Sequence, residues 1–166
     1  MLQVQSIDLY YGASRALSEV TVEAEIGKVT CILGRNGVGK TSLIRAISGL
    51  SPVKTGRLLF DGEDIGEIPA KQFAKLPMRR RIQMVFQDPT DSLNPRFTAA
   101  RAIADPILQL GDIRGRDALR ARCEELAGLV GLPVNLLDRF PHQLSGGQKA
   151  RVGIARAIAL HPKLVI

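Results

Sequence analysis

Cysteine, tryptophan and long apolar runs are scarce or missing in this chain, and each shortage excludes a class of protein. Its 166 residues include two cysteines and no tryptophan, and aromatic residues make up 4%. Cys31 and Cys123 offer neither a disulfide framework nor the spacing of a zinc site, so both are predicted to be buried, reduced thiols. Apolar runs such as VTCIL at 29–33 are far shorter than the roughly 20 residues of a membrane span. The start of the chain also lacks the regions of a secretion signal, which predicts a cytoplasmic location.

The charge is unbalanced toward the positive. Lysine and arginine number 23 against 16 acidic residues, which gives a net charge of +7. Such a chain is expected to have an anionic partner, which could be nucleic acid, an anionic membrane surface or a phosphate ligand. The densest basic run, Arg79–Arg81, is either a solvated loop face or a binding patch. Binding of single-stranded RNA would favour aromatic side chains among the basic ones. Because aromatics are few, we expect no nucleic-acid partner.

Strand and helix patterns alternate over the first half of the chain. Alternating polarity or continuous apolar runs predict strands, at residues 2–9, 20–26, 29–33, 56–60 and 81–86. The strand at 29–33 is expected to be buried on both faces. Helical spacing follows at 42–50, where Gly49 and Pro52 stop it, and an Asp61-Gly62 turn follows the strand at 56–60.

Helical patterns dominate from Thr98 onward. Asp105-Pro106 is predicted to end one helix and begin the next, because proline suits a first helical position. An apolar stripe then ends at Gly131 and Pro133; it consists of Leu119, Cys123, Leu126 and Val130. A further strand begins in HPKLVI, residues 161–166. The sequence therefore predicts an α/β core interrupted by a mostly helical insert.

Glycine is concentrated at residues 34–41, GRNGVGKT, which fit the pattern G-x-x-x-x-G-K-[ST] between a predicted strand and a helix. Glycines let the backbone turn tightly and present N–H groups to phosphate oxygens, and the helix directs its positive end at the same point. Lys40 is expected to reach the β- and γ-phosphates, and the Thr41 hydroxyl to hold Mg²⁺. The predicted nucleotide-binding residues are Gly34, Arg35, Asn36, Gly37, Val38, Gly39, Lys40, Thr41 and Ser42.

A second phosphate site is predicted at LSGGQ, residues 144–148, which opens a helix with apolar positions at Val152, Ala155, Ile158 and Ala159. Ser145 alone would serve as an N-cap. Capping does not explain Gly146 and Gly147, because each glycine costs up to about 1 kcal/mol relative to alanine in a helix. A ligand that approaches the backbone closely would explain them, although one chain has no evident need of two phosphate sites.

With these motifs in view, the sequence resembles the ATP-binding cassette (ABC) ATPases. LSGGQ is similar to their signature, Tyr11 stands where they stack an aromatic ring on adenine, and Gln87 in MVFQDP is similar to their Q-loop glutamine. The resemblance implies a P-loop NTPase core with antiparallel N-terminal strands and a helical insert. It implies three parts: an ATP-binding core at 1–97, a helical subdomain at 98–143, and the signature helix with the start of a strand at 144–166.

The resemblance also assigns roles to residues. It implies ATP and Mg²⁺ as cofactors, Lys40 and Gln87 as catalytic residues, and Thr41 and Gln87 as the residues that hold the metal. In this family two such domains pair head to tail, so each ATP lies between the phosphate loop of one and the signature of the other. The residues that would contact the partner's ATP are Leu144, Ser145, Gly146, Gly147 and Gln148.

Two parts of the chain resemble different importers. LYYGASRAL and GRNGVGKTS are similar to importers of branched-chain amino acids or urea, whereas IQMVFQDPTDSLNPR and DRFPHQLSGGQ are similar to peptide and nickel importers. We weight the latter because they adjoin Gln87; Asn94-Pro95 is either a turn or a marker of substrate class. The implied partners are a second ABC ATPase domain, transmembrane permease subunits and, indirectly, an extracytoplasmic substrate-binding protein. The chain would then lie on the inner face of the plasma membrane.

The family's remaining motifs would follow Ile166. There the strand that starts here as KLVI ends in an aspartate and a glutamate, and a switch histidine comes later. Residues 1–166 are therefore expected to lack part of the core and to hydrolyse no ATP by themselves. A soluble ABC ATPase acting on ribosomes or DNA, and a non-hydrolysing nucleotide-binding module, stay open as alternatives. His142 and His161 are expected to be loop or surface residues rather than ligands or bases.

Overall fold

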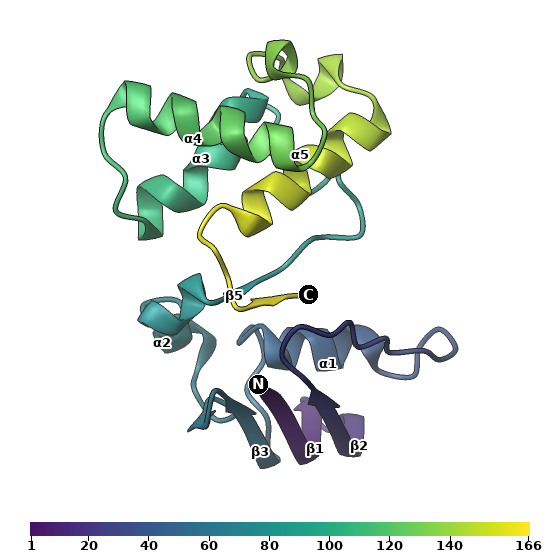
Figure 1. Ribbon diagram of the computed structural model, residues 1–166. Helices are drawn as coiled ribbons and strands as arrows, with labels where there is room; N and C mark the ends of the chain where they lie inside the picture. The colour runs from purple at the N-terminus through teal and green to yellow at the C-terminus, as the bar shows by residue number, and fades with distance from the viewer. The chain divides into compact units, whose positions relative to one another are not determined.

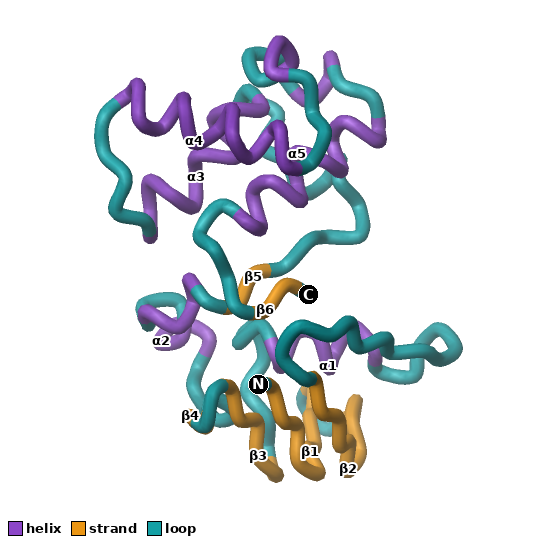
Figure 2. Tube along the Cα trace, in the orientation of Figure 1, coloured by secondary structure: helices purple, strands orange, loops and turns teal.

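The computed structural model describes residues 1–166, which divide into two compact units, Met1–Leu76 and Pro77–Ile166 (Figure 1). An antiparallel sheet with two short helices forms the first unit, and helices dominate the second (Figure 2). The predicted fold class, α/β with antiparallel N-terminal strands and a helical insert, is confirmed. The boundaries expected at residues 97 and 143 stay a prediction.

Four antiparallel strands make the sheet of the first unit, in the order β2-β1-β3-β4. They are β1 (Leu2–Tyr11), β2 (Ser14–Ala24), β3 (Thr55–Phe60) and β4 (Glu63–Asp64). In β1 the predicted alternation buries Leu2 and Val4, then changes phase to Ile7 and Leu9. The phase changes because the pairing register shifts between Val4 and Ile7, at Ser6 with φ +46°. A β-bulge of this kind moves the following side chains to the opposite alternation.

The turn predicted at Asp61-Gly62 joins β3 to β4. Phe60 pairs with Glu63, so the loop has two residues, and both have positive φ, 50° at Asp61 and 86° at Gly62. Two positive φ values in a two-residue loop match the right-handed twist of the flanking strands, and Asp-Gly suits that conformation. The predicted turn is confirmed.

Helix α1 (Lys40–Ile47) lies over one face of this sheet, and α2 (Ala70–Phe73) follows β4 (Figure 1). The buried residues of α1 are Leu43, Ala46 and Ile47. Gly49 ends the helix, as predicted, with φ +70°. A Cβ at this glycine would lie 2.3 Å from Cδ1 of Phe73, so only glycine fits between the end of α1 and α2.

The buried strand predicted at 29–33 is wrong. These residues form no helix or strand, and Val29 and Leu33 are 91% and 90% exposed. Cys31 is exposed as well, which corrects its predicted burial. The physical reason is that a strand needs hydrogen-bonding partners on its sides, and no strand in the structure pairs with this run. An apolar run in the sequence indicates that a segment is suited to burial. It does not indicate whether neighbouring strands are present to pair with it.

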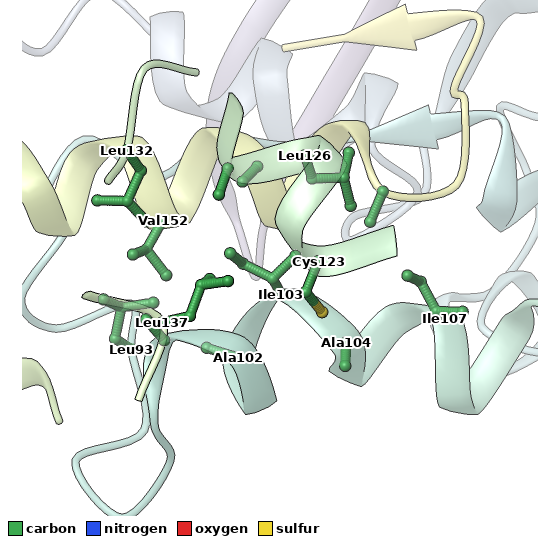
Figure 3. Packing of buried hydrophobic residues seen from close by; sticks show 14 of the residues in the cluster. Leu93, Ala102, Ile103, Ala104, Ile107, Cys123, Leu126, Leu132, Leu137 and Val152 are labelled. Carbon is green, nitrogen blue, oxygen red and sulfur yellow. The ribbon is translucent and has the colours of Figure 1, made fainter. Parts of the chain in front are cut away.

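Three helices pack together in the second unit: α3 (Ala99–Leu110), α4 (Arg116–Leu129) and α5 (Gly146–Ile158). Short 3₁₀ turns lie at Pro77–Arg80, Val134–Leu136 and Pro141–Gln143. The core of this unit (Figure 3) includes side chains at most 2% exposed, namely Ile103, Ile107, Cys123, Leu126, Leu137, Val152 and Ala155. The stripes predicted on α4 and α5 supply much of it, so those predictions are confirmed. No helix of the protein combines the length and the apolar character that crossing a membrane requires.

The helix break predicted at Asp105-Pro106 is wrong, because α3 continues through Pro106 to Leu110. Proline inside a helix removes one backbone hydrogen bond and costs about 3 kcal/mol. Ile103 and Ile107 are 0% and 1% exposed on either side of it. Burying two such side chains contributes about 1.5–3 kcal/mol each, enough to offset the cost of the proline.

Residues 81–86 and 161–166 each form a shorter strand than predicted. Only β5 (Ile82–Gln83) and β6 (Leu164–Val165) qualify, and they pair in parallel. Two further backbone bonds, from Val85 N to Ile166 O at 2.8 Å and from Ile166 N to Gln83 O at 2.9 Å, extend the pairing to the residues that precede Gln87.

Several charged side chains of the second unit are paired. Arg80 forms an ion pair with Asp112 at 2.9 Å. The buried guanidinium of Arg122 contacts Glu125 at 2.7 Å, and its Nη2 lies 2.8 Å from Nε2 of His161. His161 and His142 are both exposed, as predicted.

Candidate nucleotide-binding site

The glycine-rich loop at 34–39 enters α1 in a conformation that favours glycine. Gly37 has φ +85° and Gly39, which directly precedes the helix, has φ +95°. No side chain caps α1. The N–H groups at the start of a helix have no partner within the helix, so those of the first turn remain for another acceptor. A loop that presents such N–H groups at the positive end of a helix suits an anion.

Lys40 folds its side chain back onto the start of this loop. Its Nζ donates to the carbonyl oxygens of Gly34 at 2.6 Å and of Arg35 at 2.7 Å. An ammonium group has three N–H donors, so two of them hold the loop and one remains for a ligand oxygen. The only full positive charge supplied by the helix start is therefore fixed beside its N–H groups.

Tyr11, at the end of β1, is joined to the same helix. The hydroxyls of Ser42 in α1 and Ser51 beyond it act on its side chain, and the interaction with Ser42 is the main cause that lowers the pKa of the Tyr11 hydroxyl. The side chain is 47% exposed. The structure thus brings three predicted parts of the site together within the first unit: the half-exposed Tyr11, Ser42 and the phosphate loop. Stacking of adenine on this ring remains a proposal.

Gln87 lies in a segment of the second unit, residues 84–98, that has no helix or strand. We call it the Gln87 segment. The side chain of Gln87 is exposed. Asp88 Oδ1 accepts bonds from the N–H groups of Thr90 at 2.7 Å and Asp91 at 3.3 Å, which folds the backbone after Gln87 into a turn. Beyond that turn, Leu93 is 4% exposed in the helical core and fixes the segment at its middle.

The signature residues form the first turn of α5. Ser145 Oγ accepts a bond from Gln148 N at 3.3 Å, and Gln148 Oε1 accepts one from Ser145 N at 2.8 Å. This capping box confirms Ser145 as an N-cap. A Cβ at Gly146 or Gly147 would meet no atom within 4 Å. The packing of this chain therefore does not require either glycine, and the predicted approach of a ligand to both stays a prediction.

The predicted site residues divide between the two units. Tyr11, residues 34–39, Lys40, Thr41 and Ser42 belong to the first, whereas Gln87 and the signature residues belong to the second. A joint role of Thr41 and Gln87 at one metal ion therefore stays a proposal.

Magnesium fits the residues of the first unit only through a nucleotide. No group of three or more His, Cys, Asp or Glu side chains is arranged to hold a metal ion. Mg²⁺ is commonly held by one or two protein oxygens together with phosphates and waters. Thr41 is exposed in the first turn of α1, beside the loop, so its hydroxyl can supply one such oxygen.

Sequence reasoning missed Arg156, which is half-buried on α5. Its Nη1 donates to Ser92 O at 2.6 Å, and its guanidinium lies 5.7 Å from the ring centroid of Phe86. The only signal in the sequence is a charged residue between Ala155 and Ala157, two buried positions of the helix.

Known proteins are similar to this chain in sequence and in fold. A family model described as "ABC transporter" matches residues 17–166. The oligopeptide transport ATP-binding protein OppF of Salmonella typhimurium is 40% identical over 152 residues, which cover 92% of this chain and 45% of OppF. The dipeptide transport ATP-binding protein DppF of Lactococcus lactis subsp. cremoris is 35% identical over 173 residues, covering 100% of this chain and 55% of DppF. The chain thus spans about half the length of these relatives.

Two solved structures resemble this one. The ATP-binding cassette MJ0796, in a dimeric post-hydrolysis state bound to ADP and Pi, matches with a TM-score of 0.88 at 26% identity, over 99% of this chain and 72% of that one. CbiO1 of Clostridium perfringens, part of the ABC transporter complex CbiONQ, matches with a TM-score of 0.81 at 32% identity, over 99% of this chain and 63% of that one.

Proposed function

Because this chain belongs to the ABC transporter family, we propose that it is the ATP-binding part of an importer that takes up peptides. In this role it binds MgATP and couples binding and hydrolysis to movement of its membrane partners. The observation that carries the proposal is the phosphate loop, in which Lys40 is fixed to Gly34 and Arg35 beside the uncapped start of α1.

Each predicted residue has a role that its surroundings support. The N–H groups of the loop and of α1 bind phosphate oxygens, and Lys40 adds a full charge beside the β- and γ-phosphates. Thr41 contributes an oxygen to Mg²⁺, and the exposed face of Tyr11 stacks on adenine. Gln87 helps to orient the metal and the attacking water.

The signature residues act on a partner's nucleotide. Ser145 and the two glycines after it lie at the exposed, positive start of α5, and no contact within this chain requires those glycines. A second ABC ATPase domain supplies the phosphate loop that faces them. The dimeric state of MJ0796 supports this arrangement by similarity.

The membrane partners are proposed by similarity as well. CbiO1 belongs to a transporter complex with other subunits, and OppF and DppF are named for oligopeptide and dipeptide transport. We therefore favour peptides over branched-chain amino acids or urea as the substrate. Permease subunits would hold the chain at the inner face of the plasma membrane, and a substrate-binding protein would deliver the peptide from outside.

Residues 1–166 alone are proposed to release no phosphate. They contain no counterpart of the family's two carboxylates and switch histidine, and a water-orienting or basic group typically supplies 10²–10⁴-fold in rate. The test compares phosphate release by residues 1–166 with that of Lys40→Ala. Equal background rates are expected; multiple turnovers that disappear in the variant would contradict this proposal and make Asp88 the first carboxylate to replace.

The transport role is tested in the protein that carries this chain, reconstituted in vesicles with its permease and binding protein. ATP-dependent uptake of a labelled oligopeptide is expected, and Lys40→Ala should abolish it. Lys54→Ala removes the same charge from an exposed residue that is not part of the loop and should leave uptake unchanged. Uptake of leucine or urea but no peptide would contradict the assigned substrate.

A further inference from the structure

Helix α5 contacts the Gln87 segment through two basic side chains. Lys149 Nζ lies 3.5 Å from Thr90 Oγ1, and Arg156 Nη1 donates to the carbonyl oxygen of Ser92 at 2.6 Å. The two residues are seven positions apart, which is close to two helical turns, so they share one side of the helix. The helix that begins with the signature therefore binds the segment that contains Gln87.

The contact of Arg156 with the segment is shorter than that of Lys149. Arg156 also contacts the segment on both sides of Gln87. Phe86, whose ring lies against the guanidinium, directly precedes Gln87, and Ser92 follows five residues later. The guanidinium combines five N–H donors in a rigid plane with a flat face, which suits an aromatic ring and a carbonyl at once. Between these contacts the stretch is held by its own turn at Asp88 and by the longer contact of Lys149 with Thr90.

Packing alone does not explain an arginine at position 156, because burial of its guanidinium is energetically unfavourable. Its Nη2 is buried with no hydrogen-bond partner, and burial lowers the pKa of the guanidinium. A buried, unpaired donor is destabilising, so an apolar residue between Ala155 and Ala157 would suit the fold at least as well. What an apolar residue cannot supply is the bond to Ser92 and the contact with Phe86.

We propose that Arg156 is a positioning residue, which holds Phe86 and Ser92 and thereby fixes Gln87 relative to the signature helix. A shift of α5, whose first turn would contact a partner's nucleotide, would carry Gln87 with it. This consequence for hydrolysis rests on the proposed function, whereas the holding of the segment does not.

The first test measures backbone hydrogen exchange in the protein that carries this chain. Arg156→Gln should speed exchange at Thr90 and Asp91 about tenfold or more, the range expected when a hydrogen bond from a charged group is lost. Arg151→Gln is the matched control, because Arg151 is on the same helix and donates to a backbone carbonyl, that of Gly131, outside the segment. In Arg151→Gln, exchange at Thr90 and Asp91 should stay at the parent rate. Unchanged exchange in Arg156→Gln would overturn the proposal.

Three further variants separate positioning from folding. Arg156→Lys keeps a charged donor and should restore part of the protection. Phe86→Leu alters a side chain that is 50% exposed, so it should leave the unfolding transition in place while it speeds exchange in the segment. Residues 1–166 have no tryptophan, so the difference in emission between Phe86→Trp and the parent protein reports contact of the new ring with Arg156. A Phe86→Trp emission that Arg156→Gln leaves unchanged would contradict the contact.

The second test is kinetic. Arg156→Gln should lower kcat for ATP about tenfold and change KM by less than about twofold, because it displaces Gln87 but not the phosphate loop. Arg151→Gln should match the parent in both. Equal losses in the two arginine variants would overturn the positioning role. A parent protein that neither binds nor hydrolyses ATP would instead refute the proposed function, and the exchange experiment would still decide the role of Arg156.

Discussion

A Cβ atom at Gly39 would lie 2.7 Å from the carbonyl oxygen of Ala16, a residue of β2. The same atom would lie 2.8 Å from Cδ2 of Leu17, and the backbone of Gly39 has φ +95°. Glycine is therefore required at the last glycine position of the phosphate loop for two reasons: its backbone conformation and the strand that passes beside it. Through this contact the sheet fixes where α1 begins.

Gly39→Ala should lower the free energy of unfolding by more than the roughly 1–2 kcal/mol that a left-handed conformation costs a non-glycine residue. The extra loss comes from the displaced strand. Gly37→Ala is the control, because Gly37 has φ +85° but a Cβ there would meet nothing within 4 Å. Urea unfolding followed by circular dichroism measures both. Equal losses in the two variants would contradict the contact with β2.

The surroundings of Asp8 predict that the free energy of unfolding depends on pH in the acid range. Its carboxylate accepts bonds from Arg15 at 2.6 Å, Glu19 N at 2.8 Å and Thr55 Oγ1 at 2.8 Å. These bonds, that of Arg15 foremost, lower the pKa of Asp8 from 3.8 to about 2. A carboxyl group with a lowered pKa in the folded state stabilises the protein above its unfolded pKa, and the contribution is lost as the pH falls through the folded pKa.

Asp8→Asn should therefore be less stable than the parent at pH 6. The difference should shrink as the pH falls from about 4 to about 2, because the parent carboxylate becomes protonated over that range. Urea unfolding at a series of pH values measures the difference. A constant difference down to pH 2 would mean that the ionised carboxylate is not what the three partners stabilise.

The two cysteines should differ in reactivity. Cys31 is exposed, whereas Cys123 is 2% exposed in the helical core, and burial raises the pKa of its thiol. Thiolate and access together set the rate of alkylation. Brief treatment of folded residues 1–166 with N-ethylmaleimide should modify Cys31 alone, as peptide mass spectrometry would show. Protection of Cys31 would indicate that residues 29–33 are paired in solution.

Gly147 should separate stability from function. A Cβ there would meet nothing within 4 Å, and the residue lies in the first turn of α5. Gly147→Ala should raise the free energy of unfolding, by up to about 1 kcal/mol. Gly128→Ala in α4 is the matched control, with the same open surroundings. Only Gly147→Ala should lower ATP hydrolysis by the protein that carries this chain. Full activity in that variant would contradict a role for the signature glycines.

Local features of the fold could be predicted from the sequence, and non-local ones could not. The Asp61-Gly62 turn and the end of α1 at Gly49 depend on residues within a few positions, and both predictions are confirmed. The run at 29–33 was predicted wrongly because a strand depends on partners elsewhere. The helix through Pro106 was missed because burial of Ile103 and Ile107 outweighs a local breaker.

The candidate site follows the same division. The glycine-rich pattern predicts the loop, since the residues that form it are consecutive. The interaction of Tyr11 with Ser42 and the hydrogen bond from Arg156 to Ser92 join residues 31 and 64 positions apart. No pattern in the sequence predicts either interaction. Arg156 in particular binds a backbone carbonyl, which every residue type possesses.

The central claim, that the loop held by Lys40 binds MgATP, is tested most directly by equilibrium titration with a fluorescent ATP analogue. Folded residues 1–166 should bind it, though weakly, and Lys40→Ala should lose roughly 10–100-fold in affinity, the value of a hydrogen bond to a charged group. Lys54→Ala should bind as the parent does. Equal affinity of the parent and Lys40→Ala would contradict the account.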